Sequence, residues 1–163
     1  MTMAELNAAD RGSFVEALGW IFEHSPWVAE RVWPARPFAG IDSLHTAMTE
    51  AVSRASREEQ LALLRAHPDL GTRSRIGDAS RGEQEAAGLD RLTPAEFDLL
   101  TRQNSSYRER FGFPFLYAVK GSTRHDILSA LKSRLGNSPE AEFQEALRQV
   151  FRIARFRLDD ALS

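Results

Sequence analysis

The stretch SPEAEFQEALRQVFRIARFRLDDA at residues 138–161 decides the fold class. Ser138 followed by Pro139 is a typical N-cap and first-turn pair, so we expect a helix to begin here. The apolar residues Phe143, Leu147, Val150 and Ala154 recur at steps of three and four, and Ala161 follows seven residues later, so all five lie on one face of an α-helix. The stretch therefore predicts the last helix of the chain.

The same helical spacing recurs upstream, and strict alternation of polar and apolar residues is nearly absent. Helices are predicted over residues 7–22, 25–33, 42–52, 56–66, 80–89, 93–110 and 126–136. Asn7 is expected to cap the first of them. One apolar run, at residues 113–119, is ambiguous between helix and strand. Because there is no internal repeat and no linker, the sequence predicts an all-α fold in a single compact multi-helix domain over residues 1–163.

The composition is that of an ordinary globular chain, with 42% hydrophobic and 27% charged residues over 163 positions. The 21 basic and 23 acidic residues give a formal net charge of −2, which disfavours nucleic acid as a partner. The absence of cysteine excludes disulfides, thiolate metal sites and a cysteine nucleophile. No apolar run reaches membrane-spanning length and the N-terminus lacks a signal pattern, so we expect no membrane partner and a cytoplasmic location.

A histidine follows the helix predicted at residues 56–66 and opens the stretch HPDLGTR, residues 67–73. Pro68 disfavours helical geometry for the residue before it, so the helix should stop at or near Ala66 and leave His67 on a fixed corner. Histidine titrates near neutral pH and serves as acid or base. From position alone, a capping or surface role is more common than catalysis. Asp69 is expected to cap the turn.

Two further polar features each have a structural and a functional interpretation. The sequence SRGE at residues 80–83 fits a capping box, but Ser80 and Glu83 at an open helix start would also hold a polar or anionic ligand. Arg157 falls inside the apolar stripe of the last helix, and a buried guanidinium needs an anion. A protein carboxylate or a substrate would supply it. The histidines lack metal-ligand spacing, so no metal site is predicted.

A polar helix end runs into an aromatic, glycine and proline corner at residues 104–115. The side chains from Phe115 to Val119 are almost wholly apolar. Any specific contact of this segment with a polar ligand must therefore come from main-chain N–H and C=O groups. A segment buried in the core, without a ligand, explains the same pattern.

In their order and spacing, four pieces of the chain resemble one enzyme family: Phe22–Phe38, His67–Arg73, Ser80–Leu92 and Asn104–Phe115. The family is that of the 2-oxo-4-hydroxy-4-carboxy-5-ureidoimidazoline (OHCU) decarboxylases, which complete the route from urate to (S)-allantoin. The resemblance covers almost the whole chain. It implies a helical carboxy-lyase that acts on a small-molecule substrate, the ureidoimidazoline, without a cofactor.

The resemblance also implies roles for individual residues. His67 matches the family's proton donor, and Glu83 matches the carboxylate expected to assist it in catalysis. The residues that match the family's substrate-binding positions are Pro68, Ser80, Gln84, Phe115, Leu116, Tyr117, Ala118, Val119 and Arg157. The last three residues are not a clear peroxisomal tripeptide, so a peroxisomal address is not transferred.

Two other functions remain as alternatives. The tripeptide His-Pro-Asp between helices is also a hallmark of J-domain co-chaperones, which bind a partner protein. In that family the preceding helix is strongly basic, whereas here it reads SREEQLALLR. An inactive relative that serves as a helical interaction module is disfavoured by the intact polar set. The aromatic content near Trp27 and Trp33 would permit a homodimer.

Overall fold

The computed structural model describes residues 1–71 and 78–162, and within them every regular element is helical. This confirms the predicted all-α fold. The elements are α1 (Met3–Ala8), α2 (Arg11–Leu18), α3 (Trp27–Val32), a 3₁₀ helix η1 (Trp33–Ala35), α4 (Ile41–Ser53), α5 (Arg57–Arg65), α6 (Asp78–Ala86), α7 (Pro94–Phe111), α8 (Arg124–Arg134) and α9 (Pro139–Ala161). No helix of these ranges is long and apolar enough to cross a membrane.

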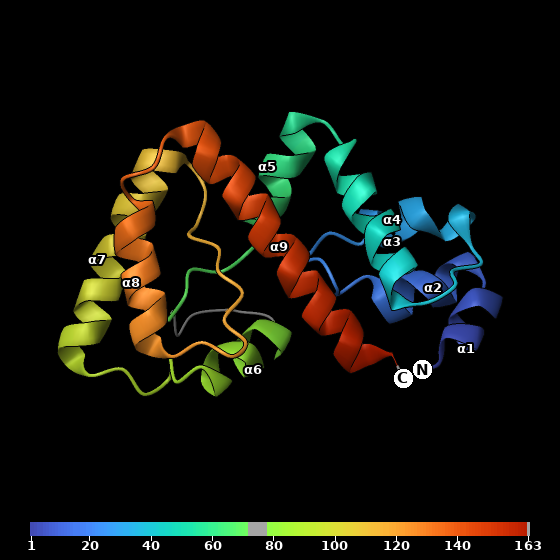
Figure 1. Cartoon of the computed structure of the whole chain (residues 1–163), viewed down its shortest axis with the longest axis horizontal. Helices are drawn as coiled ribbons and strands as arrows, with labels where there is room; N and C mark the ends of the chain where they lie inside the picture. Colours follow the sequence, from blue (N-terminus) through green and yellow to red (C-terminus); the bar gives the residue numbers. More distant parts are fainter. Residues whose placement is uncertain (72–77, 163) are drawn as a thin grey trace. The chain divides into compact units, whose positions relative to one another are not determined.

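Contacts divide the chain into two compact units. Unit 1 comprises Met1–Ala66 and the residues from Phe151 onward, and unit 2 comprises His67–Val150. The long helix α9, drawn in red-orange in Figure 1, gives its first part to unit 2 and its last part to unit 1. Of the predicted site residues, only Arg157 belongs to unit 1.

Unit 1 has its core where α2, α3 and α4 pack together, around fully buried Phe14, Val28 and Leu44. The prediction that Asn7 caps a helix over residues 7–22 is wrong. Asn7 lies inside α1, and its side-chain amide instead donates to the Phe38 carbonyl at 2.9 Å and accepts from the Phe38 N–H at 2.8 Å. A separate helix, α2, follows with Asp10 as its N-cap.

Several helix starts agree with the sequence because the capping residues act locally. Ser56 caps α5 by accepting from the Glu59 N–H at 3.1 Å, and Thr93 caps α7 by accepting from the Glu96 N–H at the same distance. The last helix begins at Pro139, as predicted. These capping residues set where α5 and α7 begin along the chain. His67 follows α5, and Asn104 of α7 contacts the turn after His67.

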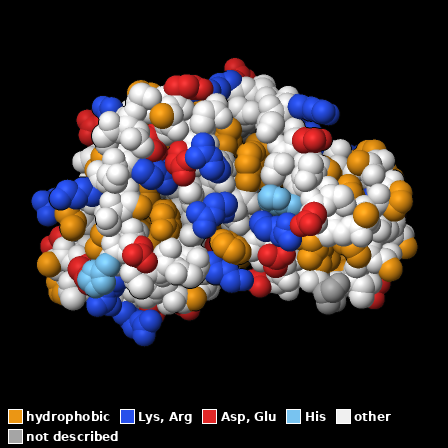
Figure 2. Space-filling view, in the orientation of Figure 1, with side chains coloured by type: hydrophobic (Ala, Val, Ile, Leu, Met, Phe, Trp, Pro, Cys, Tyr) orange, Lys and Arg blue, Asp and Glu red, His pale blue; other side chains and the backbone are white. Residues whose placement is uncertain are grey.

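In unit 2, α7 and α8 lie side by side, joined by residues 112–123 (Figure 1). The ambiguous apolar run at residues 113–119 forms no regular element. Its aromatic rings pack on Tyr107 of α7, whose ring centroid lies 5.9 Å from Phe113 and 5.4 Å from Phe115. Figure 2 shows basic and acidic side chains intermixed on one face, in line with their near-equal numbers.

Candidate active site

His67 lies directly after α5, at the start of unit 2. The helix ends at Arg65 with Ala66 as its C-cap, as the proline at position 68 predicted. Only 6% of the His67 surface is exposed. A histidine with only a surface role would be exposed to solvent. The burial of His67 therefore favours the catalytic interpretation over the surface one. Within the described ranges, no group of three or more His, Asp or Glu side chains is arranged to hold a metal ion.

The turn after His67 lies along α7. Arg108 Nη2 lies 2.9 Å from Asp69 Oδ1, and Asn104 Nδ2 donates to the Leu70 carbonyl at 2.9 Å. The contact with Arg108 is an ion pair between half-exposed groups, whereas the contact made by Asn104 is buried. Asp69 thus ties the turn to α7.

Gly71 closes this turn in a conformation that favours glycine. Its φ is +76°, and a Cβ built there would lie 2.5 Å from Leu100 Cδ2. Leu100, Asn104 and Arg108 are four residues apart and therefore share one face of α7. This face contacts three successive residues of the turn.

The helix α6 holds the same turn from another direction. Gln84 is buried, and its Oε1 accepts from the Gly71 N–H at 2.9 Å. The helix begins at Asp78, so Ser80 is its third residue and the capping box expected at Ser80 and Glu83 is wrong. The pattern misled because residues three apart also share a face inside a helix. Ser80 is buried and Glu83 is partly buried.

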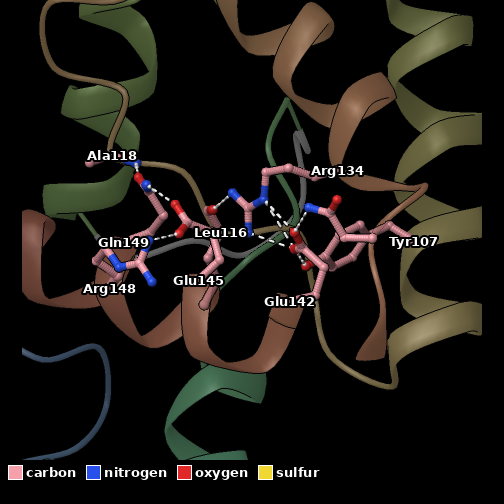
Figure 3. A network of polar contacts seen from close by, with 9 residues as sticks. Tyr107, Leu116, Ala118, Arg134, Glu142, Glu145, Arg148 and Gln149 are labelled. Atoms are coloured by element: carbon pink, nitrogen blue, oxygen red, sulfur yellow. Dashed lines mark hydrogen bonds and ion pairs between the residues drawn. The ribbon is translucent and has the colours of Figure 1, made fainter. Parts of the chain in front are cut away.

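Two main-chain groups of the apolar segment are held by side chains (Figure 3). Arg134 Nη1 donates to the Leu116 carbonyl at 2.6 Å, and Gln149 Oε1 accepts from the Ala118 N–H at 2.9 Å. The Tyr117 N–H and C=O make no hydrogen bond with any described residue. The segment is therefore fastened to the core on either side of Tyr117, and the peptide groups of this residue stay available.

A buried polar network supports this segment (Figure 3). Glu142 is fully buried and accepts from Arg134, Asn137 and the Tyr107 hydroxyl, with Arg134 Nη2 at 2.8 Å. Burial raises the pKa of Glu142, but these hydrogen bonds together outweigh burial and lower the pKa below its ordinary value. Burial, followed by the bond to Glu142, raises the pKa of Tyr107 well above its usual range. Glu142 is thus a carboxylate and Tyr107 a neutral donor.

Arg157 is 3% exposed and has an internal anion. Its Nη2 lies 3.0 Å from Glu23 Oε2, and its Nη1 donates to the carbonyls of Trp20 at 3.2 Å and Ile21 at 3.3 Å. The structural alternative for this arginine, an internal ion pair, is therefore present. The predicted contact of Arg157 with substrate stays a prediction.

The chain matches a family model described as OHCU decarboxylase over residues 7–159. The chain belongs to this family. It is 49% identical over 163 residues to the 2-oxo-4-hydroxy-4-carboxy-5-ureidoimidazoline decarboxylase of Haloferax volcanii, covering all of this chain and 97% of that protein. The family and the enzyme class expected from the sequence, a carboxy-lyase, are confirmed, and the J-domain alternative is excluded.

Solved structures of relatives have the same fold. A crystal structure of (S)-allantoin synthase matches 99% of this chain with a TM-score of 0.83 and 34% identity, and the chain spans 54% of that protein. A crystal structure of OHCU decarboxylase in the presence of (S)-allantoin matches 93% of this chain and 97% of its own, with a TM-score of 0.72 and 22% identity.

The sequence did not predict the residues that support the candidate site through hydrogen bonds and ion pairs. The sequence shows Asn104 and Arg108 as polar positions four residues apart on the predicted helix 93–110. It does not show which residues they contact. The buried pair of Arg134 and Glu142 gave no signal at all. The Gly, Thr, Ser, Arg and Asp residues between Gly71 and Ser80 also predict a surface loop, most of which lies outside the described residues.

Proposed function

We propose that this chain removes CO₂ from OHCU to give (S)-allantoin, without a cofactor and with His67 as the proton donor. The observation that carries the proposal is the burial of His67 beside a turn held by α6 and α7, in a chain of the OHCU decarboxylase family. The substrate is a small molecule, and the two units act as one functional domain, since the family match includes both.

The chemistry needs little beyond positioning and one proton. When the bond between ring carbon C4 and the carboxylate breaks, its electron pair forms a C4=C5 double bond, and the π electrons of the neighbouring ring C=N move onto the nitrogen. The C4 hydroxyl then becomes a carbonyl and its proton is taken up by that nitrogen. Protonated His67 gives its proton to one face of C5, the carbon that bears the ureido group, and becomes neutral, which sets the configuration of the product.

The α6 residues bind the polar edge of the substrate in this proposal. Glu83 accepts hydrogen bonds from the hydroxyl or ureido N–H groups of the substrate and assists His67 in catalysis. Ser80 lies in the first turn of the helix, where the main-chain N–H groups favour negative oxygen atoms. Gln84 already uses its Oε1 on Gly71, so its Nε2 is the atom that donates to substrate.

Two further elements complete the proposed site. Pro68 packs on the substrate, and the segment from Phe115 to Val119 lines the pocket. The Tyr117 N–H and C=O make its polar contacts in this proposal, while the Leu116 carbonyl and the Ala118 N–H on either side are engaged by Arg134 and Gln149.

Arg157 has a more constrained part in the proposal. We assign it to substrate oxygen atoms that become negative, with Glu23 holding the guanidinium in place. The carboxylate balances the buried positive charge before substrate arrives. A cytoplasmic location and a homodimer belong to the proposal as well, and gel filtration tests the homodimer.

The experiment exploits the spontaneous decay of OHCU to racemic allantoin. Fresh substrate is made from urate with urate oxidase and hydroxyisourate hydrolase, and circular dichroism follows its loss and the optical activity of the product. We expect faster loss and an excess of (S)-allantoin, and His67→Asn should abolish that excess. Racemic product with the unaltered protein would refute the activity, and undiminished excess with His67→Asn would remove His67 as donor.

A further inference from the structure

Two side-chain amides form hydrogen bonds with a single peptide group that follows the proposed proton donor, His67, in the chain. The Leu70 carbonyl and the Gly71 N–H belong to one peptide bond. Asn104 Nδ2 donates to this carbonyl, and Gln84 Oε1 accepts from this N–H, each at 2.9 Å. Because the C=O and N–H of a trans peptide point in opposite directions, α7 and α6 fix the peptide plane from opposite edges. We call Gln84 and Asn104 the peptide clamp.

The asparagine at position 104 carries a cost in the stability of the folded state. It is 5% exposed, and its Oδ1 is buried with no hydrogen-bond partner among the described residues. A buried polar atom left unpaired destabilises the folded state. Replacing Asn104 by leucine would remove that unpaired oxygen but leave the Leu70 carbonyl unpaired instead. Each arrangement thus leaves one orphan atom, and stability alone gives little reason for an asparagine here.

We propose that Asn104 is a positioning residue for His67, an inference that rests on the proposed function. The Leu70–Gly71 peptide lies three residues after His67 in a turn whose other contacts, at Asp69 and Gly71, come from the same face of α7. Fixing the plane of this peptide restricts the rotation of the backbone that carries the imidazole. Proton delivery to one face of a carbon requires such a restricted donor, because small displacements of a catalytic group reduce its rate steeply.

The test is Asn104→Leu, measured in the optical assay. We expect kcat to fall by about a hundredfold, with KM changed little and the excess of (S)-allantoin reduced. The unfolding temperature should stay within about 5 °C of the parent. The matched control is Gln103→Leu, the neighbour on α7, which also has a buried Oε1 without a hydrogen-bond partner but makes no hydrogen bond with the described part of the turn. The control should keep the parent kcat.

A second variant serves if Asn104→Leu does not fold. In Asn104→Asp the ionised carboxylate cannot donate to the Leu70 carbonyl, whereas the protonated carboxyl can. The ratio of its kcat to that of the parent should therefore rise as the pH falls. A kcat of folded Asn104→Leu within twofold of the parent, or a pH-independent ratio for Asn104→Asp, would overturn the inference.

The double variant His67→Asn/Asn104→Leu separates this inference from the proposed function. If Asn104 acts through His67, the double variant should be no slower than His67→Asn alone. A further loss would show that Asn104 acts elsewhere and would overturn the inference. If His67→Asn itself keeps the excess of (S)-allantoin, the proposed function fails first.

Discussion

Gln84 and Asn104 hold the two polar atoms of one peptide bond, with Oε1 of Gln84 on the Gly71 N–H and Nδ2 of Asn104 on the Leu70 carbonyl. The first residue comes from α6 and the second from α7, twenty positions later. The turn that carries His67 is thereby part of the rigid core of unit 2, although it belongs to no helix. Catalytic groups perform best when their support is as fixed as this.

Gly71→Ala should destabilise the protein more than a glycine substitution in the same backbone conformation elsewhere. The new Cβ would meet Leu100 Cδ2 at 2.5 Å, in addition to the strain of the left-handed φ. We expect a loss of about 2–4 kcal/mol in the free energy of unfolding, measured by urea denaturation. The control is Gly121→Ala, whose φ is +81° but whose Cβ would meet nothing within 4 Å. Equal losses for the two variants would contradict the clash.

Glu142→Gln should cost about 3–5 kcal/mol of stability. The change leaves the Arg134 guanidinium buried without its anion, and Arg134 also holds the Leu116 carbonyl. The matched control is Glu145→Gln on the same helix, which breaks a pair with the exposed Arg148 and should change stability by less than about 1 kcal/mol. A similar small effect at Glu142 would show that the network contributes little.

Stability should fall in acid partly through Glu142. Its pKa is lowered in the folded state, so its contribution is complete above the ordinary pKa of 4.5 and is lost as the pH falls through the lower folded-state value. At the alkaline end, the raised pKa of Tyr107 predicts a loss of stability once the pH exceeds 10, where the unfolded tyrosine ionises. Urea titrations across pH should show that Tyr107→Phe flattens the alkaline limb and, because the Tyr107 hydroxyl also helps to lower the pKa of Glu142, weakens the acid limb as well. An unchanged alkaline limb would be inconsistent with this assignment.

Arg157→Met should lower stability, because it removes the guanidinium that lies 3.0 Å from the buried Glu23 carboxylate, and it should also weaken substrate binding. Each single variant, Arg157→Met and Glu23→Leu, should lose about 3–5 kcal/mol. The double variant should be more stable than either single one, since both charges of this buried pair are then removed together. Its KM should nevertheless stay raised if Arg157 contacts substrate. Recovery of the parent KM would assign Arg157 a purely structural role.

Several helix boundaries were predicted correctly because the contacts that decide them are local. Ser56 and Thr93 cap their helices through residues three positions on, and α5 ends at Arg65, three residues before Pro68. The prediction for Asn7 was wrong because its hydrogen-bond partner, Phe38, is 31 residues away in the chain. An asparagine has the same capping pattern whether or not such a distant backbone competes for its amide.

In the candidate site, too, the partners that are distant in the chain could not be predicted. An arginine in the apolar stripe of α9 correctly signalled that an anion had to be nearby, but Glu23 lies 134 residues earlier in the chain. Likewise, Asn104 contacts Leu70 across 34 residues. The motifs identified the family, whereas the residues that hold the proposed reactive groups in place depend on how helices pack.

The Gly71 N–H offers a direct view of this turn in the absence of substrate. Backbone amides outside helices usually exchange their hydrogen for deuterium quickly, but this one is bonded to the buried Gln84 side chain. Its exchange rate therefore reports how often the support of His67 opens. Slow exchange at this single amide would make the rigidity of the turn after His67 measurable even in a protein that has no substrate bound.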